Sequence, residues 1–264
     1  MAEFTSYAEG IPCWVDVTSA DLDRSVQFYE GLFGWEAERD PRQEAGGYTM
    51  FALRGKHVAA GSPPPPGQEG VPSHWTTYLA SDDADATAAK IREAGGTVMM
   101  DPFDVFDVGR MTIAQDPTGA IFGVWQPLAF AGAQLANEPG TLNWNECQTN
   151  DPERAAAFYE QVFGYEIDEA PMGGAGVYRV LKVDGRGIAG MMEITPEMNA
   201  DGVPPNWSTV FTVADTDETV RRAEELGGKA LMPGKDLPEI GRLAVLQDPA
   251  GAVFQVLQPP PEQA

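Results

Sequence analysis

The chain has 264 residues, of which 43% are hydrophobic, a length that allows one large domain or two of about 130 residues. Its 40 acidic residues outnumber the 17 basic ones, and the formal net charge of −23 argues against nucleic acid and anionic membrane surfaces as partners, since both attract Lys and Arg patches. No segment approaches the roughly 18 consecutive apolar residues that a transmembrane helix needs.

The N-terminal residues and the rare residue types point to a reduced compartment. The first ten residues lack the basic and apolar regions of a secretory signal peptide. Two cysteines, Cys13 and Cys147, make neither a disulfide framework nor a zinc motif. The two histidines, His57 and His74, leave little room for chemistry that needs a His cluster. We therefore expect a cytoplasmic protein.

The first half of the chain predicts strands and helices in a regular order. Asp21 is placed to cap a helix, because a short carboxylate accepts hydrogen bonds from the free N–H groups of a first turn. Gly34 suits the left-handed residue that ends such a helix. In chain order, we expect a strand at 12–17, a helix between Asp21 and Gly34, strands at 48–53 and 58–61, a proline-rich loop at 62–72, a strand at 75–80, a helix at 83–94, and strands at 111–114 and 120–126.

The same landmarks return in the second half of the chain. The offset is 130 residues at first, as from Trp14 to Trp144, and 132 residues after the proline-rich loop, as from Trp75 to Trp207. Matching pairs include Asp21 and Asp151, Gly34 and Gly164, Tyr48 and Tyr178, Arg110 and Arg242, and Asp116 and Asp248. A register kept over a hundred residues indicates two copies of one module.

The repeat defines the expected organisation. We assign residues 1–128 to a first module, 129–139 to a linker and 140–264 to a second module. Each module contains two βαβββ units, so the chain holds four such units in an α+β fold of curled sheets with helices outside.

One motif carries a resemblance to a known family. The run Asp21-x2-Arg24-x3-Phe28-Tyr29-x3-Phe33-Gly34, its copy in the second module and both Asp-Pro-x-Gly turns resemble the vicinal oxygen chelate superfamily of glyoxalase I, bleomycin-resistance proteins and extradiol dioxygenases. Trp14-Val15-Asp16, Trp144-Asn145-Glu146 and the two Gly-Arg steps are similar to the two-module actinobacterial type, which includes a mycobacterial culture-filtrate antigen and carries glyoxalase-like or hydroxylase labels. The resemblance implies two fused modules, each a cup-shaped sheet with a pocket, and an internal pseudo-dimer that is a monomer or a homodimer.

The resemblance also implies where a metal would bind. Metal-dependent members hold the ion inside the cup with His and Glu side chains from three strands. The corresponding positions here are Trp14, Thr76 and Gly123 in the first module and Trp144, Ser208 and Gln255 in the second. A divalent ion needs imidazole, carboxylate or thiolate donors, and these positions supply none, so we expect no metal and no other cofactor.

Strand alternation predicts which side chains line the cups, because successive residues point to opposite faces of a sheet. The predicted lining is Trp14, Asp16, Tyr78 and Trp125 in the first module and Trp144, Glu146, Val210, Gln255 and Leu257 in the second. The same alternation turns Trp75 and Trp207 away from the cups. It also places Asn145 on a hidden face, where a polar residue has no evident reason to be.

Asp16 and Glu146 are the candidate catalytic residues. A carboxylate in an aromatic cup loses solvation, so its pKa rises and it becomes a plausible general base near neutral pH. Each carboxylate is alternatively a ligand contact, or a structural group neutralised by Arg110 or Arg242.

The remaining candidates are ligand contacts. Arg110 and Arg242 are expected either to clamp an anionic or carbonyl ligand with their planar guanidinium groups or to form an inter-module salt bridge. Trp14, Trp125 and Trp144 are either stacking surfaces for a flat ligand or core residues. Tyr78 and Gln255 line the two cups beside them.

Two functions follow as hypotheses. The first is a metal-independent glyoxalase-like enzyme, of a lyase, isomerase or hydroxylase-like type, acting on a small carbonyl or hydroxylated aromatic metabolite. Asp16 or Glu146 would move a proton next to a carbonyl, while an arginine steadies the oxyanion. The second is a non-catalytic protein that binds and sequesters a small molecule, as resistance-type members do.

The two cups are not equivalent in sequence. The first has Trp125 where the second has Leu257, and this more aromatic cup is the expected ligand site. An atypical metal set drawn from Asp16, Glu146 and His74 remains open at this point, as does the identity of the ligand.

Overall fold

A computed structural model describes residues 3–68, 70–171 and 176–261. Residues 1–2 and 262–264, at the outer ends of the two expected modules, lie outside the described residues. The elements of the first module are β1 (Pro12–Thr18), α1 (Leu22–Phe33), β2 (Glu36–Arg39), the 3-10 helix η1 (Gln43–Ala45), β3 (Thr49–Leu53), β4 (Lys56–Ser62), β5 (His74–Ala80), α2 (Ala84–Glu93), β6 (Thr97–Val105), β7 (Gly109–Gln115) and β8 (Ile121–Pro127).

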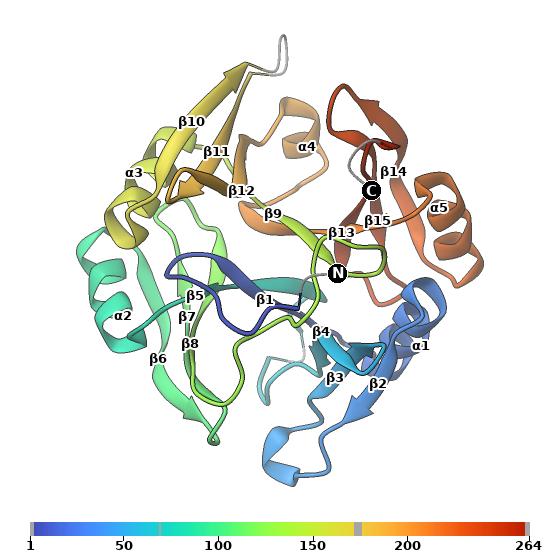
Figure 1. Ribbon diagram of the computed structural model, residues 1–264, viewed down its shortest axis with the longest axis horizontal. Helices are drawn as coiled ribbons and strands as arrows, with labels where there is room; N and C mark the ends of the chain where they lie inside the picture. Colours follow the sequence, from blue (N-terminus) through green and yellow to red (C-terminus); the bar gives the residue numbers. More distant parts are fainter. Residues whose placement is uncertain (1–2, 69, 172–175, 262–264) are drawn as a thin grey trace.

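The second module repeats this order of strands and α-helices, without a described counterpart of η1, and adds one short helix (Figure 1). Its elements are β9 (Leu142–Thr149), α3 (Pro152–Phe163), β10 (Glu166–Pro171), β11 (Val177–Val183), β12 (Arg186–Glu193), α4 (Pro196–Ala200), β13 (Asn206–Thr212), α5 (Thr216–Glu225), β14 (Lys229–Leu237), β15 (Gly241–Gln247) and β16 (Val253–Gln258). Helix α4 falls in the loop that is proline-rich in the first module and was not expected.

Each module forms one mixed eight-stranded sheet. The strand order is β2-β3-β4-β1-β5-β8-β7-β6 in the first module and β10-β11-β12-β9-β13-β16-β15-β14 in the second. The central strand β1 runs parallel to β4 and antiparallel to β5, which joins the two βαβββ units into one open, curled sheet. The four βαβββ units and the α+β class are therefore confirmed. We call the concave faces of the two sheets the first cup and the second cup.

The predicted caps position the first helix of each module. The Asp21 side chain accepts a hydrogen bond from the backbone N–H of Arg24, and α1 ends at Gly34 with a φ of 72°. Asp151 and Gly164 do the same for α3, with a φ of 71° at the glycine. This turns Phe28 and Tyr29 of α1 into the interior, where both are buried.

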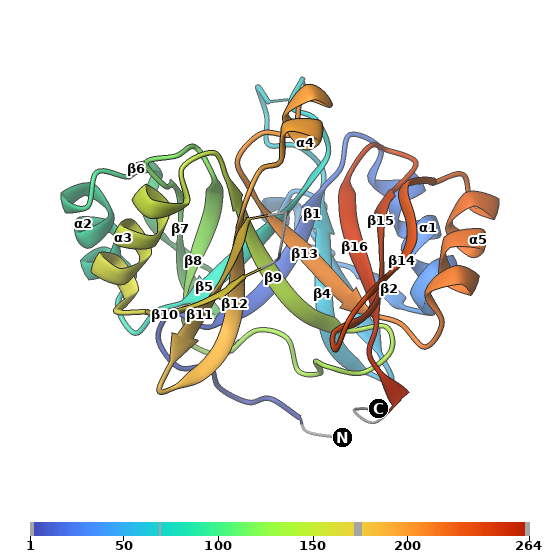
Figure 2. The same cartoon turned by 90° about the horizontal axis from the view of Figure 1, so that it is seen from above.

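The two modules share their hydrophobic cores. One core joins β1, α1, β3 and β4 to β13, α5, β15 and β16, and the other joins the remaining halves. In Figure 2, α1 accordingly lies beside α5 at one flank and α2 beside α3 at the other, with the sheets between them. The convex faces thus pack against the opposite module, and the cups face outward.

A buried hydrogen bond explains the unexpected polar residue of β9. Asn145 lies on the hidden face, as predicted, and its Oδ1 accepts a hydrogen bond of 2.7 Å from Oγ1 of Thr77 on β5. Both residues are fully enclosed. Asn145 therefore links the two sheets back to back. No helix in the described part of the chain is long and apolar enough to cross a membrane.

Candidate active site

The floor of the first cup is formed by adjacent strands β1 and β5. In their register Trp14 lies opposite Tyr78, and Asp16 lies opposite Thr76. Oδ2 of Asp16 accepts hydrogen bonds from the hydroxyls of Tyr78, at 3.0 Å, and Tyr48, at 3.2 Å. The indole N–H of Trp14 donates in turn to the Tyr48 hydroxyl oxygen, at 3.0 Å. Asp16 is thus the end point of a small hydrogen-bond network inside the cup.

The environment of Asp16 favours its neutral form. Burial raises the pKa of its carboxyl group from 3.8 to about 7, and the two tyrosine hydroxyls only partly oppose this shift by stabilising the charged form. No Lys or Arg among the described residues forms an ion pair with it. A carboxyl group with such a pKa exchanges protons readily near neutral pH.

The side chains that line the first cup are almost completely buried. Trp14, Tyr78 and Trp125 are 4%, 7% and 7% exposed, whereas Val15 and Val17, which alternate with Trp14 along β1, are completely buried. Alternation therefore separates a cup face from a sealed core face, as predicted. Two surface cavities of about 340 and 330 Å³ lie elsewhere, and neither is lined by Asp16 or Glu146.

The linker contributes a side chain that the sequence did not single out. The ring of Phe130 packs edge-on against Trp14, with centroids 4.9 Å apart and an interplanar angle of 88°. The carbonyl oxygen of Phe130 accepts a hydrogen bond of 2.8 Å from the indole N–H of Trp125. The linker therefore closes part of the first cup as well as joining the modules.

The second cup repeats the network with different partners. The indole N–H of Trp144 donates to the Tyr178 hydroxyl at 2.9 Å, and Glu146 Oε1 accepts from the side-chain amide of Gln148 at 2.9 Å. Burial raises the pKa of Glu146, opposed by hydrogen bonds from Gln148, Tyr178 and Gln255. Trp144 and Glu146 are half-buried, whereas Trp14 and Asp16 are buried, so the second cup is the more open one.

The positions that correspond to metal ligands do not fit a divalent ion. In the first cup the ring of Tyr78 fills the place of the third ligand, since a Cβ on Gly123 would come within 2.1 Å of it. In the second cup the side-chain amide of Gln255 donates to Ser208 Oγ at 2.8 Å. No group of three or more His, Cys, Asp and Glu side chains in the described ranges is arranged to hold a metal. Indole, hydroxyl, amide and glycine are the wrong donors for such an ion.

The atypical metal set also fails on geometry. Asp16 and Glu146 bond to residues of different sheets, and each points into its own cup. His74 is exposed, and its Nδ1 lies 2.8 Å from the carbonyl oxygen of Pro72. These three side chains do not converge.

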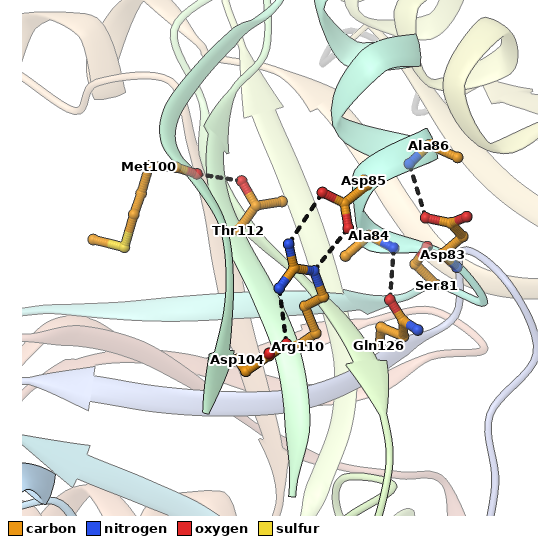
Figure 3. Close-up of polar contacts among 10 residues, drawn as sticks. All are labelled: Ser81, Asp83, Ala84, Asp85, Ala86, Met100, Asp104, Arg110, Thr112 and Gln126. Carbon is orange, nitrogen blue, oxygen red and sulfur yellow. Dashed lines mark hydrogen bonds and ion pairs between the residues drawn. The ribbon is translucent and has the colours of Figure 1, made fainter. Parts of the chain in front are cut away.

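The structure places the two arginines outside the cups. Arg110 bonds to Asp85 at 2.7 Å and to Asp104 at 2.8 Å, as Figure 3 shows. Arg242 makes the equivalent pairs with Asp217 and Asp236. All of these partners lie within the arginine's own module, so these pairs are neither an inter-module bridge nor a clamp on a ligand held at the carboxylates. The physical reason is alternation: Arg110 is next to Met111, which packs into the first cup, and therefore faces α2.

Two of the tyrosines that contact the carboxylates, Tyr48 and Tyr178, were missed as site residues, whereas Tyr78 was predicted. Tyr48 and Tyr178 are equivalent positions of the repeat, so their pairing was visible in the sequence. Their position at or beside the start of the third strand of each unit gave no sign that the hydroxyl turns toward the cup. Gln148 and Phe130 had no such signal, because neither is matched in the other module.

The sequence matches two related family models. Residues 13–124 match the Glyoxalase/Bleomycin resistance protein/Dioxygenase superfamily, and residues 144–257 match the glyoxalase-like domain. The "Putative glyoxylase CFP32" of Mycobacterium bovis is 44% identical over 265 residues, covering 100% of both chains. The anthracycline biosynthesis protein DnrV of Streptomyces peucetius is 41% identical over 268 residues, covering 96% of this chain and 95% of its own.

Solved structures agree on the fold. The Mn(II)-bound glyoxalase from Novosphingobium aromaticivorans superposes with a TM-score of 0.66 at 17% identity, covering 95% of this chain and 83% of its own. The 2,2',3-trihydroxybiphenyl 1,2-dioxygenase from Sphingomonas wittichii gives a TM-score of 0.65 at 15% identity, covering 95% and 91%. With two family models and full-length relatives in agreement, the chain belongs to the glyoxalase/bleomycin resistance protein/dioxygenase superfamily.

Proposed function

We propose that the protein is a metal-independent enzyme that moves a proton on a small carbonyl or hydroxylated aromatic metabolite held in the first cup. One observation carries this proposal: Asp16 lies at the floor of an aromatic cup, its pKa is raised to about 7, and two hydroxyl donors contact the same carboxylate oxygen. Such a group is half ionised at neutral pH and works as both base and acid.

The proposed step is a reversible proton transfer. Ionised Asp16 takes a proton from the carbon next to the substrate carbonyl, and the C–H electron pair moves to the carbonyl oxygen to give an enolate. Protonated Asp16 then needs fewer donors, so the hydroxyl of Tyr48 or Tyr78 turns to the enolate oxygen. Return of a proton to the same carbon restores the carbonyl compound, so atoms and electrons balance, and in D2O the original hydrogen is replaced by deuterium.

The tyrosines suit this role because they keep their protons. Burial and the nearby charge of Asp16 raise the pKa of both Tyr48 and Tyr78 well above the usual value. Since no arginine of the described chain lies in the first cup, the Tyr48 and Tyr78 hydroxyls are the donors next to Asp16 that can stabilise the enolate. They replace the arginines of the original hypothesis.

The lining indicates the class of substrate. Trp14, Trp125 and Phe130 pack their aromatic rings together in the first cup, and such a lining fits a flat molecule better than a branched one. The names of two relatives, a glyoxylase and an anthracycline biosynthesis protein, agree with a carbonyl or planar aromatic compound. The same aromatic lining supports the alternative function, sequestration of such a compound without turnover.

The test compares two matched substitutions in the full chain. Asp16→Asn and Glu146→Gln each replace one cup carboxylate by its amide. A panel of hydroxylated aromatic ketones and α-hydroxy carbonyl compounds is incubated in D2O, and loss of the proton next to the carbonyl is followed by NMR. We expect exchange by the unmodified protein, a loss of about 100-fold or more in Asp16→Asn, and retention in Glu146→Gln.

Binding distinguishes the two functions. Quenching of tryptophan fluorescence measures the affinity of the same compounds, and Asp16→Asn should change it little if the carboxylate acts as a base. Binding without any exchange by the unmodified protein would favour sequestration. Loss of exchange in Glu146→Gln alone would move the active site to the second cup.

A further inference from the structure

The linker is anchored to the first cup by backbone hydrogen bonds. The N–H groups of Leu128 and Phe130 both donate to the carbonyl oxygen of Val108, at 3.0 Å each. The N–H of Ala133 donates to the carbonyl oxygen of Cys13 at 2.8 Å. These contacts hold the segment across one end of β1 and the β6–β7 turn. A free spacer between two modules would not need them.

Phe130 touches both tryptophans of the first cup. Its ring lies edge-on to Trp14 at 4.9 Å and to Trp125 at 6.2 Å, with interplanar angles of 88° and 74°. Its carbonyl oxygen holds the Trp125 indole N–H. The packing therefore fixes the orientation of the indole of Trp14.

That orientation matters because the indole begins a directional chain of donors. The Tyr48 hydroxyl oxygen accepts a hydrogen bond of 3.0 Å from the Trp14 N–H, and its own O–H donates to Asp16 at 3.2 Å. A rotated indole would remove the first bond and release the Tyr48 hydroxyl. Phe130 is thus connected to Asp16 through two intermediate side chains, Trp14 and Tyr48.

We propose that Phe130, carried into the first cup by the inter-module linker, is a positioning residue that holds Trp14 and Tyr48 in place and keeps water from Asp16. The inference rests on the proposed role of Asp16 for its catalytic meaning, but not for its structural effect. With this role for Phe130, the linker between the modules is part of the candidate site in the first cup but not of the second cup.

The second cup provides an internal comparison. The same chain of donors runs from Trp144 through Tyr178 to Glu146. Among the residues that the structure describes, no aromatic ring packs on Trp144. Loss of Phe130 should therefore disturb Asp16 and leave Glu146 unchanged.

The titratable groups around Asp16 are few. Among the described residues they are the hydroxyls of Tyr48, just before β3, and Tyr78 on β5, with Tyr7, the thiol of Cys13 on β1 and the ring of His57 on β4 farther away. Burial is the largest cause that raises the pKa of Asp16. In a variant without the Phe130 ring, water that reaches Asp16 should lower its pKa by more than a weakened hydrogen bond from Tyr48 would raise it. We therefore expect the pKa of Asp16 to fall.

The experiment measures both carboxyl groups by NMR in protein labelled with ¹³C at the Asp and Glu carboxyl carbons. The signals are assigned by their absence in Asp16→Asn and Glu146→Gln. In Phe130→Ala we expect the pKa of Asp16 to fall by about one unit, a tenfold change in its ionisation constant, with no change at Glu146. Phe130→Trp keeps a ring and should restore the original value.

Phe4→Ala is the matched control, because Phe4 stacks on Tyr7 at 5.6 Å beside the same linker but has no ring contact with Trp14. It should leave both carboxyl groups unchanged. An unchanged Asp16 in Phe130→Ala, or equal changes at Asp16 and Glu146, would overturn the inference. Phe130→Leu, which keeps volume but no ring edge, serves if the alanine variant does not fold.

The outcome is separable from that of the proposed function. The NMR titration requires no turnover, so it stands even if Asp16→Asn leaves proton exchange intact. If Asp16 is the base, the pH at which kcat is half-maximal should shift in Phe130→Ala by the same amount as the NMR value.

Discussion

The hydroxyl of Tyr29 on α1 donates a hydrogen bond of 3.2 Å to Oδ2 of Asp248, in the turn before β16, across 219 positions of the chain. The hydroxyl of Ser25 donates to the same oxygen at 2.8 Å, and backbone N–H groups bind Oδ1. The equivalent contact runs from the second module to the first: the hydroxyl of Tyr159 on α3 donates to Oδ2 of Asp116 at 3.1 Å. The first helix of each module thus binds the Asp-Pro-x-Gly turn of the other, so buried hydrogen bonds join the two modules at two equivalent places.

This relationship predicts the effect of removing one hydroxyl. Tyr29→Phe leaves the indole N–H of Trp75 without its acceptor and Asp248 without one of its donors. We expect a loss of about 1–3 kcal/mol in the free energy of unfolding, measured with urea. Tyr159→Phe should cost about the same, because Trp207 and Asp116 are its equivalent partners. A loss below about 0.5 kcal/mol in both variants would mean that the contacts are incidental.

The pKa of Asp16 predicts how stability depends on pH. Its pKa is about 7 in the folded protein and 3.8 without the fold, so the folded state binds the proton more tightly between these values. The stabilisation from this group is therefore fully present below about pH 4 and is lost as pH rises through about 7. Relative to Asp16→Asn, unfolding free energy should fall by about 1.4 kcal/mol per pH unit in this window. Urea unfolding at several pH values checks this, and a pH-independent difference between the two proteins would contradict it.

The general fold followed from the sequence because its signals are local. Caps such as Asp21 and Gly34, and turns such as Asp116-Pro117-Thr118-Gly119, occur twice at constant spacing, so each copy supported the other. The strands that were missed, β2, β6, β10 and β14, are the four edges of the two sheets. Their residues are mostly exposed, and no apolar alternation marks them.

The candidate site was only partly accessible to the same reasoning. Alternation along β1 identified Trp14 and Asp16, since a strand's faces follow from its sequence alone. The contact of Asp16 with Tyr48, just before β3, depends on how the sheet curls, and the position of Phe130 depends on how the linker folds back. Neither is a local property, so neither Tyr48 nor Phe130 was predicted.

A substitution at Tyr48 tests the hydrogen bonds of the carboxylate. Tyr48→Phe removes a donor that stabilises the charged form of Asp16, so the pKa of Asp16 should rise above about 7. The ionised base would then be available only at higher pH, and the rising limb of a kcat profile should move upward. Tyr178→Phe should raise the pKa of Glu146 in the same way. NMR titration of the carboxyl carbons measures both, and a fall in either pKa would contradict the assignment.

The packing of Tyr78 predicts the importance of Gly123. A methyl group at this position would come within 2.1 Å of the Tyr78 ring, so the ring must move away from Asp16. Gly123→Ala should cost about 1–3 kcal/mol of unfolding free energy and remove the 3.0 Å bond to the carboxylate. Gly70→Ala, where a Cβ meets nothing within 4 Å, is the control. Equal stability of the two variants would show that the first cup has more space than the structure indicates.

The bond between Thr77 and Asn145 predicts an asymmetry between the modules. Asn145→Val leaves the fully buried Thr77 hydroxyl without its acceptor, and we expect a loss of about 1–3 kcal/mol. The double variant Thr77→Val with Asn145→Val removes both partners and should recover most of this loss, which a double-mutant cycle in urea measures.

Thr209 supplies the comparison for this cycle. It occupies the position in β13 that Thr77 occupies in β5, but the residue equivalent to Asn145 is Val15. The Thr209 hydroxyl is buried and has no hydrogen-bond partner among the residues that the structure describes. A buried hydroxyl without a partner opposes folding, so Thr209→Val should leave stability unchanged or raise it. If Thr77→Val lowers the free energy of unfolding and Thr209→Val raises it, Asn145 stabilises the contact between the modules at one of two equivalent positions. A loss of similar size in both variants would mean that threonine contributes through packing alone, and that the bond to Asn145 adds nothing.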